Sequence, residues 1–352
     1  MLNGFKILVS IVFLTAAGIL SAKSVVNIEF YGLAHLSYDN VDDGLEQTQH
    51  VASNSSRLGI KGSRSISDNL KVIFQYESGV DLTAQGVNDG NGGAFSAGQI
   101  FTKGRPSFIG VKGNMGTVLM GHYNGLDQWA NDFNFFADQV GDLGNLWEGS
   151  GLPGRLDNVM FYQSPKFNDT HISLTLVPGE EDDSGENVIL KADYGKSNLK
   201  LGLAYSKFQT AGAADDHTGI ALTAKYSTSK FTLGFGFQTE ADTNSALNDD
   251  RDSLAVGGAF KVNDKVTAKV QYAVSTSDFD NADATQIALG LDYSLDSNNT
   301  LYIALASMDN DDNVNFSVNG KGHGDKIVPL PGEDMATLSI GFVSSFEMGF
   351  KP

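Results

Sequence analysis

The chain has 352 residues, 40 glycines, 7 prolines and no cysteine, and its 42 acidic residues outnumber its 24 basic residues. The net charge of −18 argues against a nucleic-acid partner, which would need a basic surface, and favours a surface that attracts cations. Without cysteine, an exported fold must close without disulfides.

Residues 1–22 have the organisation of a secretory signal peptide. Lys6 precedes the apolar run ILVSIVFLTAAGIL, and the small pair Ser21 and Ala22 follows it. The run is short for a membrane anchor, which needs ~20 apolar residues. We therefore expect cleavage after Ala22 and one mature domain, 23–352. No later stretch is long and apolar enough for a membrane helix.

The remaining chain alternates between apolar and polar residues with a period of two, which is typical of strands with one buried face. In 230–238, for example, phenylalanine and leucine alternate with threonine, glycine and glutamine. This pattern predicts sixteen strands, which start near residues 26, 57, 68, 105, 117, 156, 171, 187, 198, 217, 230, 252, 265, 285, 300 and 335.

The connections between these strands alternate between short and long. Short turns include 113–116 and 227–230, whereas the long connections hold most of the acidic residues. The long connections are 39–55, 81–103, 124–155, 178–186, 208–216, 240–251, 277–284 and 309–334. A meander that crosses a membrane keeps its long connections on one side, because its two ends face different compartments. A soluble β-sandwich also alternates, but its solvated face usually carries more charge than the Thr, Ser, Gln and Gly found here.

The sequence therefore predicts an all-β fold: a transmembrane antiparallel up-and-down β-barrel of sixteen strands. Sixteen strands enclose an aqueous channel rather than a packed core. The third long connection, 124–155, is unusually rich in Trp and Phe, so we expect it to fold into the lumen and pack on the inner wall. It would bring three acids to a constriction: Asp132, Asp138 and Asp142.

Three arginines are candidates for a basic wall opposite these acids. Arg57 has the parity of lumen-facing residues, and Arg105 and Arg155 start the strands beside the third connection. A transverse field between carboxylates and guanidinium groups would order water and set ion preference in a narrow pore. For each arginine alone, an ordinary lumen or rim charge is the alternative.

Several segments resemble Gram-negative general diffusion porins, which are trimeric sixteen-stranded barrels. They are SNSSRLGIKGSRSISDNLKVIFQYESGVDL (53–82), GRPSFIGVKGNMGTVLMGHYNGL (104–126), GRLDNVMFYQSP (154–165) and LSIGFVSSF (338–346). The resemblance implies trimerisation, an inward-folded third loop, passive diffusion of small hydrophilic solutes, and a constriction lined by Arg57, Arg105 and Arg155.

The chain departs from the family pattern in three places. FADQVGD replaces the Pro-Glu-Phe-Gly-Gly type motif of the third loop, so which of its three acids faces the pore stays open. Leu33 stands where the first strand often has a lysine, which fits a weaker basic wall and a cation bias. The chain also continues beyond Phe346, so either Phe346 or Phe350 ends the last strand.

We conclude from the sequence that the chain is a Gram-negative outer-membrane general porin with mild cation selectivity, for ions and small hydrophilic solutes. The expected partners are two further copies in a homotrimer and lipopolysaccharide, bridged by divalent cations. No cofactor or metal site is expected. The alternative is a sugar or oligosaccharide channel of the same architecture. An enzyme is disfavoured because none of the six histidines lies in a catalytic or metal-binding motif; a soluble adhesive β-protein is a further alternative.

Overall fold

The computed structural model describes residues 26–83, 104–125, 132–147, 154–179, 187–209, 215–243 and 249–350. The expected signal peptide, 1–22, lies outside these residues. The described chain forms one antiparallel sheet and a short helix, α3 (Gly144–Trp147). In this part of the chain, no helix has the length and apolar character needed to cross a membrane.

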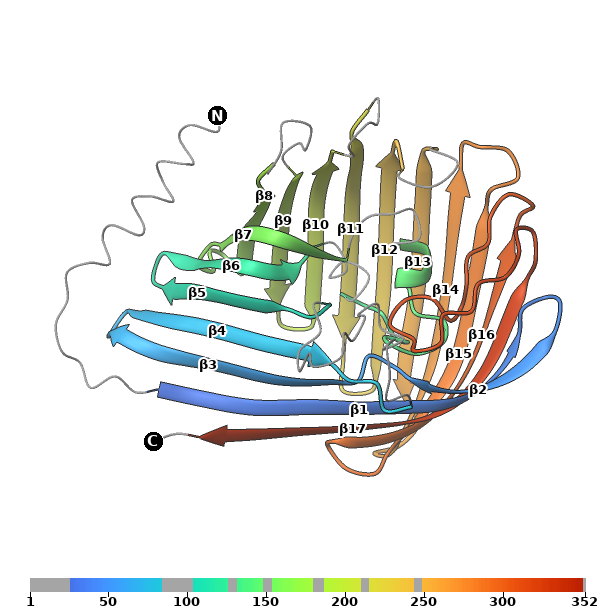
Figure 1. Ribbon diagram of the computed structural model, residues 1–352, viewed down its shortest axis with the longest axis horizontal. Helices are drawn as coiled ribbons and strands as arrows, with labels where there is room; N and C mark the ends of the chain where they lie inside the picture. The colour runs from blue at the N-terminus through green and yellow to red at the C-terminus, as the bar shows by residue number, and fades with distance from the viewer. Residues whose placement is uncertain are drawn as a thin grey trace, which may run out of the picture.

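The strands follow one another along the chain as predicted (Figure 1). They are β1 (Val26–Asp42), β2 (Gln47–Ser53), β3 (Arg57–Ser67), β4 (Leu70–Gly79), β5 (Ser107–Gly113), β6 (Gly116–Asn124), β7 (Arg155–Gln163), β8 (Thr170–Val177), β9 (Asn187–Lys196), β10 (Leu199–Phe208), β11 (His217–Ser227), β12 (Phe231–Ala241), β13 (Arg251–Lys261), β14 (Val266–Ser277), β15 (Ala284–Ser294), β16 (Asn299–Asn310) and β17 (Met335–Phe350). Apart from the second, each predicted strand begins within two residues of its expected position.

The first and last strands close the sheet into a barrel. β1 pairs antiparallel with β17 along its length, from Ile28 opposite Phe350 to Asp42 opposite Ala336. The two strands run side by side in Figure 1, in blue and red. Because the pairing continues to Phe350, the last strand ends there and not at Phe346. Among the described strands, this closure leaves no free sheet edge, as a membrane-spanning sheet requires.

The second strand is longer than predicted and is interrupted. β2 and β3 both pair with β1 and are separated only by residues 54–56, so the seventeen strand segments form a sixteen-stranded barrel. The expected long connection 39–55 is therefore wrong: β1 continues to Asp42, and only 43–46 form the turn. Polar residues on both faces of QTQHVAS hide its strand character.

The two faces of the sheet differ as the alternation predicts. In β12, Phe231, Leu233, Phe235 and Phe237 are exposed, whereas Gly236 and Gln238 on the opposite face are buried. The same pattern recurs in β15, where Ile287, Leu289, Leu291 and Tyr293 are exposed. An apolar outer face and a polar inner face are the arrangement of a membrane-spanning barrel.

Candidate functional site

Residues 132–147 of the third long connection pack on the polar face of the sheet. Three buried glutamines from β12, β14 and β15 hold this segment by its backbone. Gln238 Nε2 donates to the Trp147 carbonyl at 3.1 Å, and Gln271 and Gln286 both donate to the Gly141 carbonyl at 2.9 Å. Gln271 Oε1 also accepts a hydrogen bond from the amide of Phe135 at 3.1 Å. The packing of these residues is what an inward-folded loop requires.

Glycines on the polar face provide the space for the aromatic side chains of this segment. A Cβ atom on Gly234 would lie 2.6 Å from Phe133, and one on Gly257 would lie 2.7 Å from Phe135. Gly290 and Gly236 make similar close approaches to Phe136 and to Phe133 with Trp147. Phe133, Phe136 and Trp147 are at most 2% exposed as a result. The aromatic residues that predicted the packing are therefore anchors buried against the wall.

The last long connection also reaches this segment, which the sequence reading did not predict. Within residues 311–334, the Val318 carbonyl accepts from the Gly141 amide at 3.0 Å, and the Lys321 amide donates to Asn145 Oδ1 at 2.7 Å. Val318, Asn319 and His323 are fully buried. One feature of the sequence could have predicted this contact. The segment FSVNGKGHG at 316–324 lacks acidic residues, although the connection around it is acidic.

The interruption between β2 and β3 sets the position of Arg57. Ser55 has a φ of 52°, in the left-handed region that disfavours residues with a side chain. The break is held by the hydrogen bond from the Asn54 amide to the His35 carbonyl at 2.8 Å, and Ser56 Oγ accepts from the His35 amide at 3.0 Å. Arg57 follows at once and donates from NH1 to the Ser55 carbonyl at 3.1 Å.

Arg57 faces an acid of the third connection. Its NH1 atom lies 3.5 Å from Asp138 Oδ2, and the two side chains are 26% and 31% exposed, so the pair remains accessible to water. Asp138 has a φ of 59°, a conformation that non-glycine residues adopt rarely and that clusters at functional positions. The contact joins the barrel wall to the loop segment.

Arg105 belongs to the same charged cluster. Its NH1 atom lies 3.8 Å from Glu77 Oε1, and the Tyr31 hydroxyl donates to Glu77 Oε2 at 2.7 Å. Burial, and after it the charges of Arg57 and Arg155, lower the pKa of Arg105 to about 10. The guanidinium group still carries its charge at neutral pH. The three predicted arginines thus share one electrostatic environment, and sequence reasoning missed Glu77 and Tyr31 as the partners that hold it.

The three predicted acids occupy different surroundings. Asp138 faces Arg57, whereas Asp132 accepts hydrogen bonds from Thr223 at 2.7 Å and Lys191 at 3.4 Å. Asp142 is buried inside its own segment, and its carboxylate accepts from the amides of Asp138 and Gly144 at 2.8 Å. Burial, and secondarily the charge of Asp138, raise the pKa of Asp142 to about 7. The structure therefore brings only Asp138 to the arginines.

The family of the chain follows from a sequence comparison. Residues 8–313 match the model of the family described as Gram-negative porin. The chain belongs to this porin family. Porins are channels and not enzymes, and they lie in the outer membrane, as the apolar outer face of this barrel requires.

Two relatives and one solved structure illustrate the likeness. Outer membrane porin protein 32 of Delftia acidovorans is 25% identical over 90% of this porin and 93% of the relative. A chitoporin of Vibrio furnissii is 25% identical over 56% of this chain, which spans 53% of that relative. The structure of an anion-selective porin from Comamonas acidovorans superposes with a TM-score of 0.75 at 22% identity, covering 91% of this chain and all of that one.

Proposed function

We propose that this porin is a general diffusion channel whose narrowest part lies between Arg57, Arg105 and Arg155 on the wall and Asp138 on the third loop. The observation that carries the proposal is the 3.5 Å contact between Arg57 and Asp138, which joins opposite charges across the inner face while leaving both accessible to water. Such a field orders water and admits small polar solutes in preference to apolar ones.

The burial of the loop aromatics supports a general channel over a sugar-specific one. A sugar track requires aromatic faces turned to the water-filled lumen. Among the loop residues that the structure describes, Phe133, Phe136 and Trp147 are instead buried against the barrel. Trp129, a further aromatic residue of this connection, lies outside the described residues. The relation to a chitoporin keeps the sugar channel as the alternative that an experiment must separate.

The mild cation selectivity is proposed to arise at the mouth of the pore and not at its arginine-rich narrow part. The long connections carry most of the 42 acidic residues, so they form an acidic mouth. Fields from exposed charges reach about 30 Å at 0.01 M salt but only about 3 Å at 1 M. Cation preference should therefore be strongest in dilute salt and weaken as the salt concentration rises.

Planar-bilayer recording tests these proposals together. We expect water-filled channels whose reversal potential in a KCl gradient shows cation preference at low ionic strength and less at high ionic strength. Neutral sugars should lower the conductance only in proportion to solution conductivity. Anion preference in dilute salt would contradict the selectivity proposal, and saturable block by one sugar would replace the general channel with the sugar-specific one.

The assembly proposed for the channel is a homotrimer in contact with lipopolysaccharide through divalent cations. The continuous apolar outer face can accommodate neighbouring copies as well as lipid. At the rim, Glu333 lies against the turn 43–46, where Asp43 and Glu46 add further carboxylates for a bridging cation. Cross-linking of the unheated protein measures the trimer, and repeating it with a chelator measures the contribution of the bridging divalent cations.

A further inference from the structure

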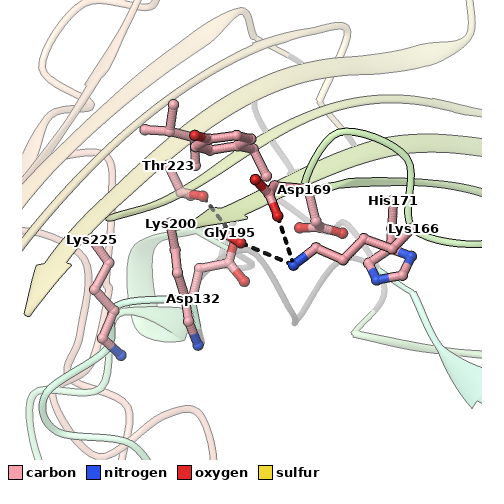
Figure 2. Close-up of a pocket in the computed structure, with 11 residues that line it drawn as sticks. Asp132, Lys166, Asp169, His171, Gly195, Lys200, Thr223 and Lys225 are labelled. Atoms are coloured by element: carbon pink, nitrogen blue, oxygen red, sulfur yellow. Dashed lines mark hydrogen bonds and ion pairs between the residues drawn. The ribbon is translucent and has the colours of Figure 1, made fainter. Parts of the chain in front are cut away.

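A cavity of about 410 Å³ lies between the third-loop segment and the short turns at one end of the barrel. Strands β8 to β11 and the turn before β8 form it, and Asp132 of the loop reaches into it (Figure 2). A solute that passes the loop towards the short-turn end therefore meets this cavity next. Its lining carries three lysines and three aspartates: Lys166, Lys200, Lys225, Asp132, Asp169 and Asp193.

Two of these lysines stand directly opposite each other. Lys200 of β10 pairs in register with Lys225 of β11, and Figure 2 shows the two side chains extending in the same direction. Both belong to the inner face, because Thr223, two residues before Lys225, donates to Asp132 of the loop. A Cβ on Gly202, two residues after Lys200, would likewise meet Asp132, at 2.7 Å.

The acids of the cavity are engaged by other lysines. Lys191 lies 3.4 Å from Asp132 and 3.2 Å from Asp193. Asp169 is paired with Lys166 at 3.4 Å and with Lys196 at 3.5 Å.

Within the residues that the structure describes, Lys200 and Lys225 form no ion pair. Like charges directly opposite each other destabilise a pair of strands. An ionisable group that faces the water-filled lumen without an ion-pair partner is a candidate for a role in solute passage.

The space beside the two lysines is open. On the other side of Lys200, Gly195 is its register partner in β9, and a Cβ atom at Gly195 would meet no atom within 4 Å. Lys225 is half-buried, which weakens the screening of its charge by water. Ammonium groups are compact charges with freely rotating donors, and they bind phosphate-type oxygens well.

We propose that Lys200 and Lys225 form a binding subsite for a small oxyanion with two negative charges, on the short-turn side of the third loop. The site rests on the proposed diffusion function, since its ligand arrives through the pore. It makes the inner part of the lumen attractive to anions although the mouth and the whole chain are acidic. A dianion would neutralise the two opposed charges at once, whereas chloride would neutralise only one.

Inorganic phosphate at about pH 8, where it is mainly a dianion, is the probe. In bilayers held at constant ionic strength with KCl, we expect phosphate to lower the single-channel conductance of the wild-type porin in a saturable way. The double variant K200Q/K225Q should raise the half-blocking phosphate concentration by about tenfold, because each lost charge-assisted hydrogen bond weakens binding. Unfolded variants would form no channels, so a normal conductance in KCl alone shows that the barrel is intact.

A matched control removes a second opposed lysine pair outside the cavity. Lys71 of β4 and Lys112 of β5 are register partners near another short turn, and neither lines the cavity. K71Q/K112Q should leave the half-blocking concentration unchanged. Equal effects of both double variants, or a wild-type conductance that phosphate does not saturate, would overturn the subsite. Failure to form any channel would instead contradict the proposed function.

Discussion

His323 Nε2 lies 3.1 Å from Asp39 Oδ2, and neither side chain is accessible to solvent. The other ring nitrogen, Nδ1, lies 3.0 Å from the Asp325 carbonyl oxygen. Asp39 belongs to β1, so this contact ties the last long connection to the wall. Without His323, Asp39 would keep hydroxyl donors such as Ser37 Oγ, at 2.9 Å, but would lose its imidazole partner; breaking a buried pair costs up to about 3–5 kcal/mol.

We expect His323→Ala to release residues 316–324 from the inner wall. The channel should then show a larger mean conductance and more current noise than the wild type, because the released segment no longer fills part of the lumen. His50→Ala is the control: His50 contacts Asp325 of the same connection at 3.2 Å but is 31% exposed, and exposed pairs contribute about 0–1 kcal/mol. Equal current traces for the two variants would contradict the role of His323.

A second prediction concerns the glycines of the inner wall that leave space for the loop aromatics, which we call the glycine sockets. Gly236→Val should displace Phe133 from the wall, because a Cβ there would already lie 2.5 Å from its ring. Loss of a buried phenylalanine contact costs roughly 3–5 kcal/mol, so the segment should become cleavable by added protease while the barrel stays folded.

Gly258→Val in the adjacent strand provides the comparison for Gly236→Val. A Cβ there meets Leu233 on the outer face at an ordinary 3.4 Å. It should leave cleavage unchanged. A protease-resistant Gly236→Val loop would show that the sockets do not hold the segment.

The charges at the proposed constriction give opposite expectations for ion preference. Asp138→Asn keeps a residue that tolerates the left-handed conformation but removes the negative charge, so the reversal potential should move towards anions. Arg57→Gln should move it towards cations. Asp43→Asn removes the same charge from an exposed turn at the mouth and should change the reversal potential little at 1 M salt. Shifts of one sign for both constriction variants would be inconsistent with the proposed field.

The pH dependence of the third-loop segment should follow Asp142. Because burial raises the pKa of this carboxyl from 3.8 to about 7, its contribution to loop packing is complete below pH 3.8 and is lost as the pH rises to about 7. The full effect is on the order of 4 kcal/mol. Protease cleavage of the segment should therefore be faster at pH 8 than at pH 6, and Asp142→Asn should remove that difference.

The strands were predictable because apolar and polar residues alternate along them. Along most of β12 and β15, for example, every second residue is apolar and lies on the outer, lipid-facing side. The β2 segment escaped because polar residues lie on both of its faces, although it pairs with β1 across the short turn 43–46. Arg57 could be located from its place in the alternation of inward- and outward-facing residues, and Arg105 and Arg155 from their position beside the third connection. The resemblance to porins indicated the same three arginines. The acids could not be ranked, because hydrogen bonds from the loop backbone to Asp142, invisible in the sequence, bury one carboxylate and turn another towards Arg57.

The contacts around the strand break have a consequence for assembly. Ser55 donates to the Gly322 carbonyl across 267 positions of sequence, and the Gly324 amide donates to Asn54 Oδ1 across 270. We expect such distant partners to meet late in folding, because the entropy of closing a long loop opposes their contact until the pairing of β1 with β17 has brought the two segments together. The porin should thus begin as a wide, open cylinder and acquire its narrow passage in the final step of folding. A chain arrested after the barrel has closed, but before these contacts form, would conduct more current than the finished channel.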